Sequence, residues 1–247
     1  MITKKIMQAE VTTKYIVVEK IPEKPNVSTL RLRLVSGGVP AFIAGQFITV
    51  YFPETGTPEG KAYSISSPPS QDSIAITVKA IGEFSNRLVG LRQGDTVTGS
   101  LPYGYFYSES SDNPLVLLAA GVGIAPFRSM VHDRLIETPL RYISLFSSVK
   151  KTADILFKKE FDILGERHRN FKPHYYITQE QNISNDMTAG RITARRVLDK
   201  IALDPSTEFL LCGSISFTRD LWRDLRASGI PEESIYTEAF FSNYLQQ

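Results

Sequence analysis

The chain has 247 residues, of which 42% are hydrophobic and 22% are charged. This is an ordinary globular composition, with enough apolar material for one large domain or two small ones. Lysine and arginine together number 28, and aspartate and glutamate number 26, so the formal charge is only +2. That balance gives no electrostatic case for a nucleic-acid or membrane-surface partner.

Cysteine and histidine usage limits the chemistry further. The single cysteine excludes an intramolecular disulfide, an all-cysteine zinc site and a four-cysteine iron–sulfur cluster within this chain. The histidines, His132, His168 and His174, are not three or four residues apart and form no local metal motif. A redox cofactor of this chain would therefore be organic. The N-terminal stretch lacks the apolar core of a signal peptide, and no run of about 18 apolar residues occurs, so we expect a soluble cytoplasmic protein.

Short β-rich runs at close spacing occupy the first half of the chain. Apolar residues alternate with polar or small ones, most clearly over 28–35 and 73–81, and glycine or proline turns separate the runs. The runs lie at 14–20, 28–35, 46–52, 73–81 and 95–101. Five or six such strands, with one short helix at 85–90, predict a small antiparallel β-barrel.

The pattern changes after residues 110–114. Residues 115–120 form a continuous apolar run, as expected of a strand buried on both faces. Helical patterns and further apolar runs then alternate, which predicts βαβ units and a parallel sheet. We therefore expect two domains: an antiparallel β-barrel over residues 1–110 and an α/β parallel-sheet nucleotide-binding domain over residues 111–247.

A glycine turn follows the first strand of the second domain. It reads Ala-Gly-Val-Gly-Ile-Ala-Pro and includes Gly121, Gly123 and Pro126. Glycine lets a ligand approach the backbone, and a helix N-terminus offers unpaired N–H groups to an anion. The position of the turn predicts a dinucleotide site. A tight structural turn is the alternative, because proline replaces the third glycine of the full pattern.

Two segments of the barrel half are also candidates. Residues 61–67 form a strand with Lys61 and Tyr63 on one face and Ser64 on the other. Residues 82–88 form a glycine turn that feeds a helix capped near Ser85, a second candidate anion site. An edge strand with a surface tyrosine and an ordinary capped helix are the alternative interpretations.

Seven motifs, taken in order, resemble those of the ferredoxin–NADP reductase superfamily of flavoproteins. The motifs read K-A-Y-S, T-V-K, G-x-F-S-N-R-L, G-D-x-V-x-G-S-L-P-Y-G-Y-F, A-A-G-V-G-I-A-P, L-C-G-S and T-E-A-F, and the resemblance as a whole covers the chain from about residue 10 to residue 240. The resemblance implies a two-domain reductase with FAD in the barrel and NAD(P)H in the second domain.

By this resemblance, Tyr63 packs on the flavin ring, the Ser64 hydroxyl lies near flavin N5 and Lys61 holds the pyrophosphate. The family usually has arginine at the position of Lys61, and lysine keeps the charge but loses the two-pronged grip. The resemblance also assigns flavin contacts to a backbone segment and a phosphate-binding turn. These residues are Val78, Lys79, Gly82, Phe84, Ser85 and Asn86, in a form closer to the FAD members.

In the second domain the resemblance assigns the nicotinamide-dinucleotide turn to Gly121, Gly123 and Pro126. Ala125 stands where the family usually has threonine. Cys212, followed by Gly213, matches a cysteine beside nicotinamide C4, and Glu238 matches a near-terminal carboxylate. Ser64, Cys212 and Glu238 are thus the expected catalytic residues. From the residues alone, a small buried hydrophobe and a solvated strand-end charge are the alternatives for Cys212 and Glu238.

The choice of nucleotide depends on the end of the strand over 141–148. Ser147, Ser148, Lys150 and Lys151 supply two hydroxyls and two positive charges, and no acidic residue follows immediately. This set favours the 2′-phosphate of NADPH, with NADH and a solvated loop as alternatives. The C-terminal aromatic residues Phe240, Phe241 and Tyr244 either stack over the flavin, as in some family members, or pack on the surface.

The resemblance implies hydride transfer between NAD(P)H and FAD, followed by electron transfer to a separate acceptor, with ferredoxin or flavodoxin as the first expectation. Two rival enzymes are an oxygenase reductase component and a reductase of free flavins. A rival of another class is a non-catalytic flavin- and nucleotide-binding subunit of a larger electron-transfer complex.

Overall fold

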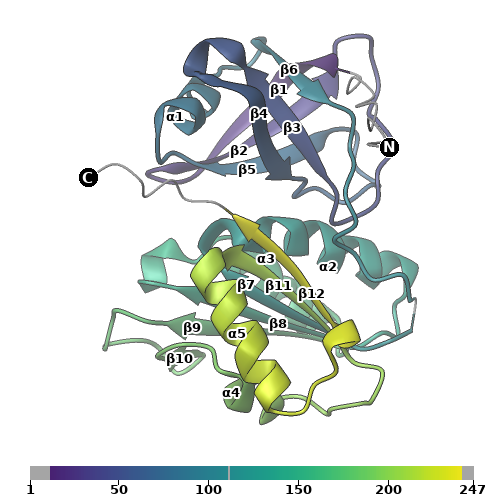
Figure 1. Cartoon of the computed structure of the whole chain (residues 1–247), viewed down its shortest axis with the longest axis vertical. Coiled ribbons are helices and arrows are strands. Elements are labelled where there is room, and N and C mark those ends of the chain that lie inside the picture. The colour runs from purple at the N-terminus through teal and green to yellow at the C-terminus, as the bar shows by residue number, and fades with distance from the viewer. Residues whose placement is uncertain (1–11, 111, 241–247) are drawn as a thin grey trace, which may run out of the picture.

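The computed structural model describes residues 12–110 and 112–240, which form two sheets of different construction. An antiparallel sheet from the first half of the chain lies above a parallel sheet from the second half (Figure 1). The predicted division between residues 110 and 111 falls in the connection between these two sheets. The predicted fold class, a β-barrel followed by an α/β domain, is confirmed.

Six strands form the barrel, in the spatial order β4-β3-β6-β1-β2-β5 with antiparallel neighbours. Their bounds are β1 (Thr12–Lys24), β2 (Val27–Leu34), β3 (Phe47–Phe52), β4 (Thr57–Ser64), β5 (Ile74–Lys79) and β6 (Thr96–Ser100). An isolated bridge between Ile65 and Ile76 joins the chain after β4 to β5. The two edges of the sheet therefore meet, and the barrel closes around one hydrophobic core.

The alternating residues of the barrel strands fill this core, as the period-two pattern predicts. Leu30 and Leu32 of β2 and Ile74 and Ile76 of β5 are completely buried. One helix, α1 (Glu83–Gly90), covers the barrel and inserts Phe84 into the core.

Helix α1 begins earlier than the sequence indicates. The Ser85 hydroxyl accepts the N–H groups of Ile81 at 2.9 Å and of Gly82 at 3.1 Å. Ser85 therefore braces the turn from inside the helix, and Gly82 is the residue that precedes it. The expected cap near Ser85 is thus met by its side chain, which reaches back to the start of the helix, while the N-cap position itself belongs to Gly82.

Six parallel strands form the second sheet, in the order β10-β9-β8-β7-β11-β12. Their bounds are β7 (Leu115–Ala120), β8 (Ile143–Val149), β9 (Phe171–Ile177), β10 (Met187–Ala189), β11 (Glu208–Ser214) and β12 (Ile235–Phe240). The three-residue strand β10 is not predicted, because it is too short to show a periodic pattern.

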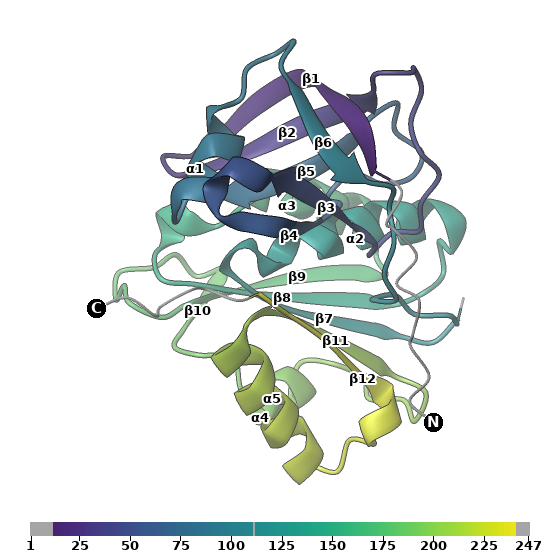
Figure 2. The ribbon, with the colours of Figure 1, turned by 45° about the horizontal axis from the view of Figure 1, so that its top comes forward.

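Helices cover both faces of this sheet. Figure 2 shows α2 (Ala125–Glu137) and α3 (Lys158–Arg167) between the sheet and the barrel, and α4 (Ala194–Leu198) and α5 (Ile215–Ala227) on the far side. Strand β7 supplies both cores: Leu117 packs with α2 and α3, whereas Leu118 packs with α4 and α5. Burial on both faces explains why residues 115–120 form an unbroken apolar run.

A buried ion pair holds the connection between the two sheets. Arg141 donates to Glu208 at 3.0 Å, to the Ser108 hydroxyl at 2.9 Å and to the Ser110 carbonyl at 2.8 Å. Burial lowers the pKa of Arg141 to about 10, and Glu208 acts against this shift. The pair thus fixes the connection to the amino-terminal ends of the parallel strands, because Arg141 precedes β8 and Glu208 begins β11.

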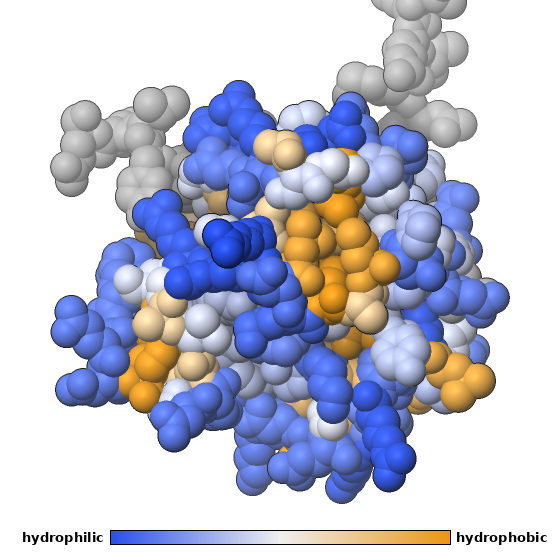
Figure 3. Space-filling model, turned by 90° about the horizontal axis from the view of Figure 1, so that it is seen from below, coloured by the Kyte–Doolittle hydropathy of each residue, from blue (hydrophilic) through white to orange (hydrophobic). Residues whose placement is uncertain are grey.

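The outer face of the parallel-sheet domain is mostly polar. Seen from below, hydrophilic side chains surround a large apolar patch near the centre, and smaller apolar areas lie towards the left and right edges (Figure 3). Within residues 12–110 and 112–240, every helix is too short or too polar to cross a membrane.

His174 gives this domain an expected dependence on pH. Its ring stacks on Phe146 at 4.6 Å, and burial, with Lys200 and Lys172 nearby, lowers the pKa of His174 from 6.5 to about 4. As the pH falls through 6.5, the unfolded chain binds a proton before the folded one does, so the folded state loses stability.

We expect the parent protein to lose about 1 kcal/mol more unfolding free energy than His174→Phe between pH 7 and about pH 5.5. Urea unfolding of both proteins at several pH values measures this difference. Equal losses in the two proteins would assign the acid sensitivity to another group.

Candidate active site between the two domains

The two domains meet at a hydrogen bond between predicted catalytic residues. Ser64 ends β4 of the barrel, and its hydroxyl donates to Glu238 Oε1 on β12 at 2.6 Å. Cys212 on β11 pairs in register with Glu238 and, on its other side, with Ala119 of β7. The structure therefore brings together Ser64, Cys212 and Glu238, which come from three distant parts of the chain.

Burial controls the charge of this group. Burial raises the pKa of Glu238, and the hydrogen bond from Ser64 acts in the opposite direction. Burial, reinforced by the Glu238 carboxylate, raises the pKa of the Cys212 thiol well above its usual value. Cys212 is thus an uncharged thiol packed in the core, and the site favours a protonated or hydrogen-bonded carboxyl over a free carboxylate.

The glycine turn after β7 lies beside Cys212. A Cβ added to Gly123 would meet the Cys212 carbonyl oxygen at 2.2 Å, so only glycine lets the turn lie against β11. Gly121 has a φ of +56°, and a Cβ added there would meet nothing within 4 Å. The open space beside Gly121 leaves its backbone accessible to a ligand. Helix α2 begins directly after this turn, with Pro126 in its first turn, where a proline fits best.

Gly213 lies in a second close approach. A Cβ added there would come within 2.9 Å of the Ala120 side chain and 3.0 Å of the Phe217 ring. Gly213 thus lets β11 and the start of α5 pack against the end of β7. Its role in the structure is packing next to the glycine turn.

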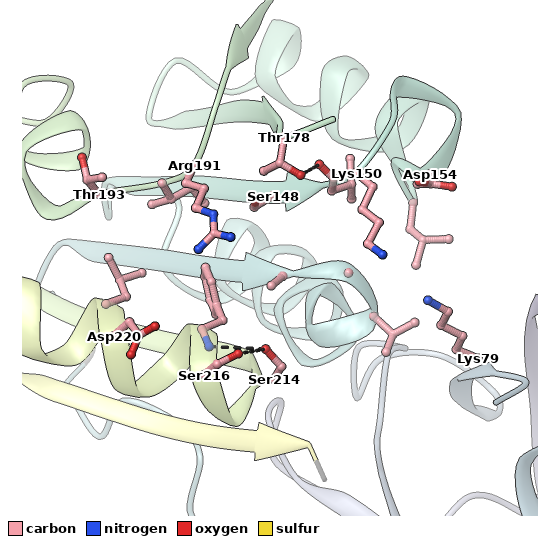
Figure 4. A pocket seen from close by; sticks show the side chains of 18 of the residues that line it. Lys79, Ser148, Lys150, Asp154, Thr178, Arg191, Thr193, Ser214, Ser216 and Asp220 are labelled. Atoms are coloured by element: carbon pink, nitrogen blue, oxygen red, sulfur yellow. Dashed lines mark hydrogen bonds between the residues drawn. The ribbon is translucent and has the colours of Figure 1, made fainter. Parts of the chain in front are cut away.

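A cleft of about 970 Å³ opens next to this turn, and residues of both domains line it. Lys79 comes from the barrel, and Gly121, Ser148 and Lys150 come from the ends of β7 and β8. Figure 4 shows the side chains of Lys79, Lys150 and Arg191 turned towards the same space. The basic side chains and the exposed glycine backbone suit a ligand with several phosphates.

Of the four residues expected to choose between NADPH and NADH, Ser148 and Lys150 line the cleft, whereas Ser147 and Lys151 do not. Ser147 pairs with Ala119 and shares its buried face, whereas Ser148 pairs with Ala120 on the face of the cleft. Lys151 lies outside the cleft lining, and its backbone N–H donates to Asp154 at 3.1 Å. The alternation of a β-strand separates the serines, since neighbouring side chains point to opposite faces.

Sequence reasoning missed part of the lining. Arg191, Thr178, Ser214 and Ser216 all line the cleft. Arg191 follows β10, a strand with no periodic signal, so nothing in the sequence pattern pointed to it. Ser214 is the last residue of the L-C-G-S motif and Ser216 follows two residues later, and their position at the start of α5 was the available signal.

On the barrel side, Lys61 and Tyr63 lie over Phe84. The Tyr63 and Phe84 rings are 6.4 Å apart and nearly parallel, and Lys61 Nζ is 5.3 Å from the centre of the Phe84 ring. Phe84 itself is 2% exposed. It supports Lys61 and Tyr63 from beneath and offers little surface to a ligand. Burial raises the pKa of Tyr63, so its phenol stays neutral.

The turn before α1 is held by its own side chains. Besides the bonds that Ser85 accepts, Asn86 Nδ2 donates to the Gly82 carbonyl at 3.0 Å. The first-turn N–H groups of α1 are therefore the groups left to bind an anion there. Val78 is buried, but β5 is an edge strand, so beyond the bridge at Ile76 its backbone has a strand neighbour on one side only.

Of the C-terminal aromatic residues, Phe240 ends β12 and packs partly against the core beneath the barrel. Phe241 and Tyr244 lie outside the described residues. Across the described part of the chain, no cluster of three histidine, cysteine or acidic side chains is placed to hold a metal ion.

Comparison with known proteins agrees with this geometry. Residues 117–222 match the family model of the oxidoreductase NAD-binding domain. The chain is 27% identical over 243 residues to a flavohemoprotein of Bordetella pertussis, covering 91% of this chain and 59% of that protein. It is 31% identical over 172 residues to reductase component 1 of terephthalate 1,2-dioxygenase from Comamonas sp., covering 68% of this chain and 50% of that one.

A solved structure matches the whole two-domain arrangement. The flavohem-like FAD/NAD-binding domain of nitric oxide dioxygenase from Vibrio cholerae has a TM-score of 0.80 and 25% identity to this chain. The match covers 92% of this chain and 98% of that domain. By contrast, the chain spans only 59% of the length of the Bordetella flavohemoprotein.

The hydrogen bond between the domains gives a direct test. We expect Ser64→Ala to raise the pKa of Glu238 further, because it removes the bond that partly offsets burial. A pH titration of the glutamate side-chain carbons by NMR measures the shift. Ser228→Ala, an exposed serine at the end of α5, is the control. An unchanged or lower pKa of Glu238 in Ser64→Ala would contradict the assignment.

Proposed function

The chain belongs to the ferredoxin–NADP reductase superfamily, and we propose that it is an FAD-dependent NAD(P)H oxidoreductase that passes electrons to a separate acceptor. The observation that carries this proposal is the bond from Ser64 to Glu238 beside Cys212. This bond brings the end of β4, on the proposed flavin side, against the end of β12, on the proposed nucleotide side. Hydride transfer requires the flavin and nicotinamide rings to meet face to face at such a place.

The barrel residues fit FAD. Tyr63 offers a half-buried ring for stacking, and the one-sided backbone edge at Val78 and Lys79 offers hydrogen-bonding groups to a flat ligand. Lys61, with the first turn of α1 at Gly82 to Asn86, supplies positive charge and N–H groups for the phosphates. When bound, FAD supplies the chemistry of accepting a hydride at N5 and releasing its electrons singly.

The residues of the second domain fit a nicotinamide dinucleotide. Gly121 presents an open backbone to the phosphates, and Gly123 and Pro126 shape the turn and the helix start that follow it. Cys212 and Glu238 border the position of the nicotinamide ring. Because its pKa is raised, Glu238 can hold a proton on its carboxyl group, and the Ser64 hydroxyl can donate to that group or to the flavin.

We expect Tyr63→Ala to weaken FAD retention by at least about tenfold, because the stacking surface is lost. Fluorescence titration of the flavin-free protein with FAD measures the affinity. Tyr142→Ala is the matched control, since Tyr142 is 68% exposed at the start of β8. Equal affinities in Tyr63→Ala and the parent would remove Tyr63 from the flavin site.

We propose NADPH as the preferred donor. The support is the position of Lys150 and Ser148 at the cleft, together with Arg191. A guanidinium and an ammonium group in one cleft suit the extra 2′-phosphate, which NADH lacks. Ser147 and Lys151, which lie outside the cleft lining, have no part in this proposal.

The two neighbouring lysines give a matched test of this preference. Lys150→Glu should lower the ratio of NADPH to NADH specificity constants by about tenfold or more, because it sets a negative charge against the 2′-phosphate. Lys151→Glu makes the same change of charge outside the cleft and should have a much smaller effect. Equal changes in both variants would indicate general charge rather than a phosphate site.

The acceptor is proposed to be a separate redox protein, first a ferredoxin or flavodoxin. A second candidate is an oxygenase or haem-containing partner, favoured by the Comamonas reductase component and the Bordetella flavohemoprotein among the relatives. A cytoplasmic location stays a prediction from the sequence, to be checked by fractionating cells that express a tagged chain.

One series of measurements separates these proposals. A flavin spectrum after purification, then stopped-flow reduction by NADPH and by NADH, tests the reductase itself. Turnover with ferredoxin, flavodoxin, an oxygenase component, free FMN and a cytochrome then ranks the acceptors. A protein that binds no flavin would refute the reductase, and flavin binding with negligible turnover would favour the non-catalytic subunit.

A further inference from the structure

Two side chains of α2 reach from the nucleotide-side domain into the barrel. Arg128 Nη1 donates to the Ser66 carbonyl at 3.0 Å, and the Ser129 hydroxyl donates to the Ser67 carbonyl at 2.6 Å. Ser66, Ser67 and Ser129 are completely buried, so these bonds are shielded from water. They join the domains at a place separate from the bond between Ser64 and Glu238.

The Arg128 side chain is held in place by α3. Its Nε atom lies 2.9 Å from each oxygen of Glu160, which also accepts a bond from His132. Burial alone would raise the pKa of Glu160, but the bonds from His132 and Arg128 lower it, so the carboxylate stays charged. The guanidinium therefore faces a carboxylate that is charged at neutral pH, and its bonds to Glu160 and Ser66 restrict its rotation.

An unusual backbone conformation completes this arrangement. The guanidinium carbon of Arg128 is 4.9 Å from the centre of the Phe157 ring. Phe157 has a φ of +58°, and it is the one non-glycine residue with a positive φ within the described ranges. Such a conformation persists only where surrounding contacts enforce it, so the ring position beneath Arg128 is itself constrained.

The anchored carbonyls lie close to both halves of the active site. Ser66 is two residues after Ser64, and Arg128 is five residues after Gly123 of the dinucleotide turn. Two short backbone segments, residues 64–66 and residues 123–128, and the Arg128 side chain therefore connect the barrel half of the site to the nucleotide half. A displacement along this route moves the strand end that carries Tyr63 and Ser64 relative to α2.

We propose that Arg128 is a positioning residue that sets the distance and tilt between the flavin and nicotinamide rings, and that Ser129 assists it through its own bond to the barrel. This rests on the proposed reductase function. Transfer between two rings is sensitive to small displacements, and an error of about 1 Å can reduce a rate about 100-fold. The binding surfaces for the two cofactors use other residues, so a loss of Arg128 affects the transfer step more than either affinity.

The test compares Arg128→Met with Arg31→Met in the FAD-bound protein. Arg31 also makes three side-chain bonds, to Glu19, Asp72 and Ser73, but all of them stay within the barrel. We expect Arg128→Met to slow single-turnover flavin reduction at saturating nucleotide by at least tenfold. The dissociation constants of FAD and nucleotide should change by less than threefold, and Arg31→Met should keep the parent rate.

A second measurement does not depend on activity. In the flavin-free protein, Arg128→Met should speed amide hydrogen exchange at residues 65–67, whereas Arg31→Met should not. Ser129→Ala removes one bond of the same pair, so it should shift both readouts in the same direction by a smaller amount. This variant decides the question if Arg128→Met does not fold.

Parent-like reduction and exchange in Arg128→Met would overturn the proposal, as would a loss of rate that only follows a loss of bound FAD. Failure of the reductase function itself shows differently, because the parent protein would then not be reduced by NADPH or NADH. In that case the exchange measurement alone still decides whether Arg128 couples the domains.

Discussion

The hydrogen bond between Ser64 and Glu238 joins two sheets that have no strand in common. For it to form, the end of an antiparallel strand must meet the carboxyl end of a parallel one at less than 3 Å. The other features of the site depend on that meeting, since residues of both domains line the cleft beside Gly121. The molecule is therefore organised around a junction, and contacts across the junction determine the geometry of the site.

The parallel sheet provides its half of the junction through close packing. All its strands point the same way, so the turns after β7, β8 and β11 gather at one edge, as is general for ligand sites of such sheets. Gly123 and Gly213 let these turns lie against one another where any side chain would clash. The cleft opens next to these packed turns, beside Gly121.

Much of this organisation is predictable from the sequence, because strand alternation and buried apolar runs directly reflect which face is covered. Helix α1 and strand β10 show where that reasoning ends: one depends on a side chain that bonds backward, the other is three residues long. Ser147 and Ser148 show a finer limit, since the sequence supplies the hydroxyls but not the face each one occupies. Arg191 could not be predicted as part of the cleft, because the strand that positions it, β10, is too short to show a periodic pattern.

Contacts to backbone carbonyls leave no trace in a single sequence at all. The acceptors of Arg128 and Ser129 are the carbonyls of Ser66 and Ser67, which any residue type would provide. What the sequence does show is an arginine in the first turns of a helix, with nothing to distinguish it from a solvated charge. Its role depends on tertiary placement, because only in the folded molecule does Glu160 fix the guanidinium on one side.

Cys212 connects the chemistry and the packing of the site. As the sole cysteine it has two interpretations, a buried small side chain or a group beside the nicotinamide; the structure shows the burial, and the place beside the nicotinamide stays a prediction. Its backbone carbonyl defines how closely Gly123 must approach, and its strand partner is Glu238. Burial keeps the Cys212 thiol uncharged and also raises the pKa of Glu238, so the neighbouring strands place a neutral thiol beside a carboxyl group that holds a proton more readily than usual.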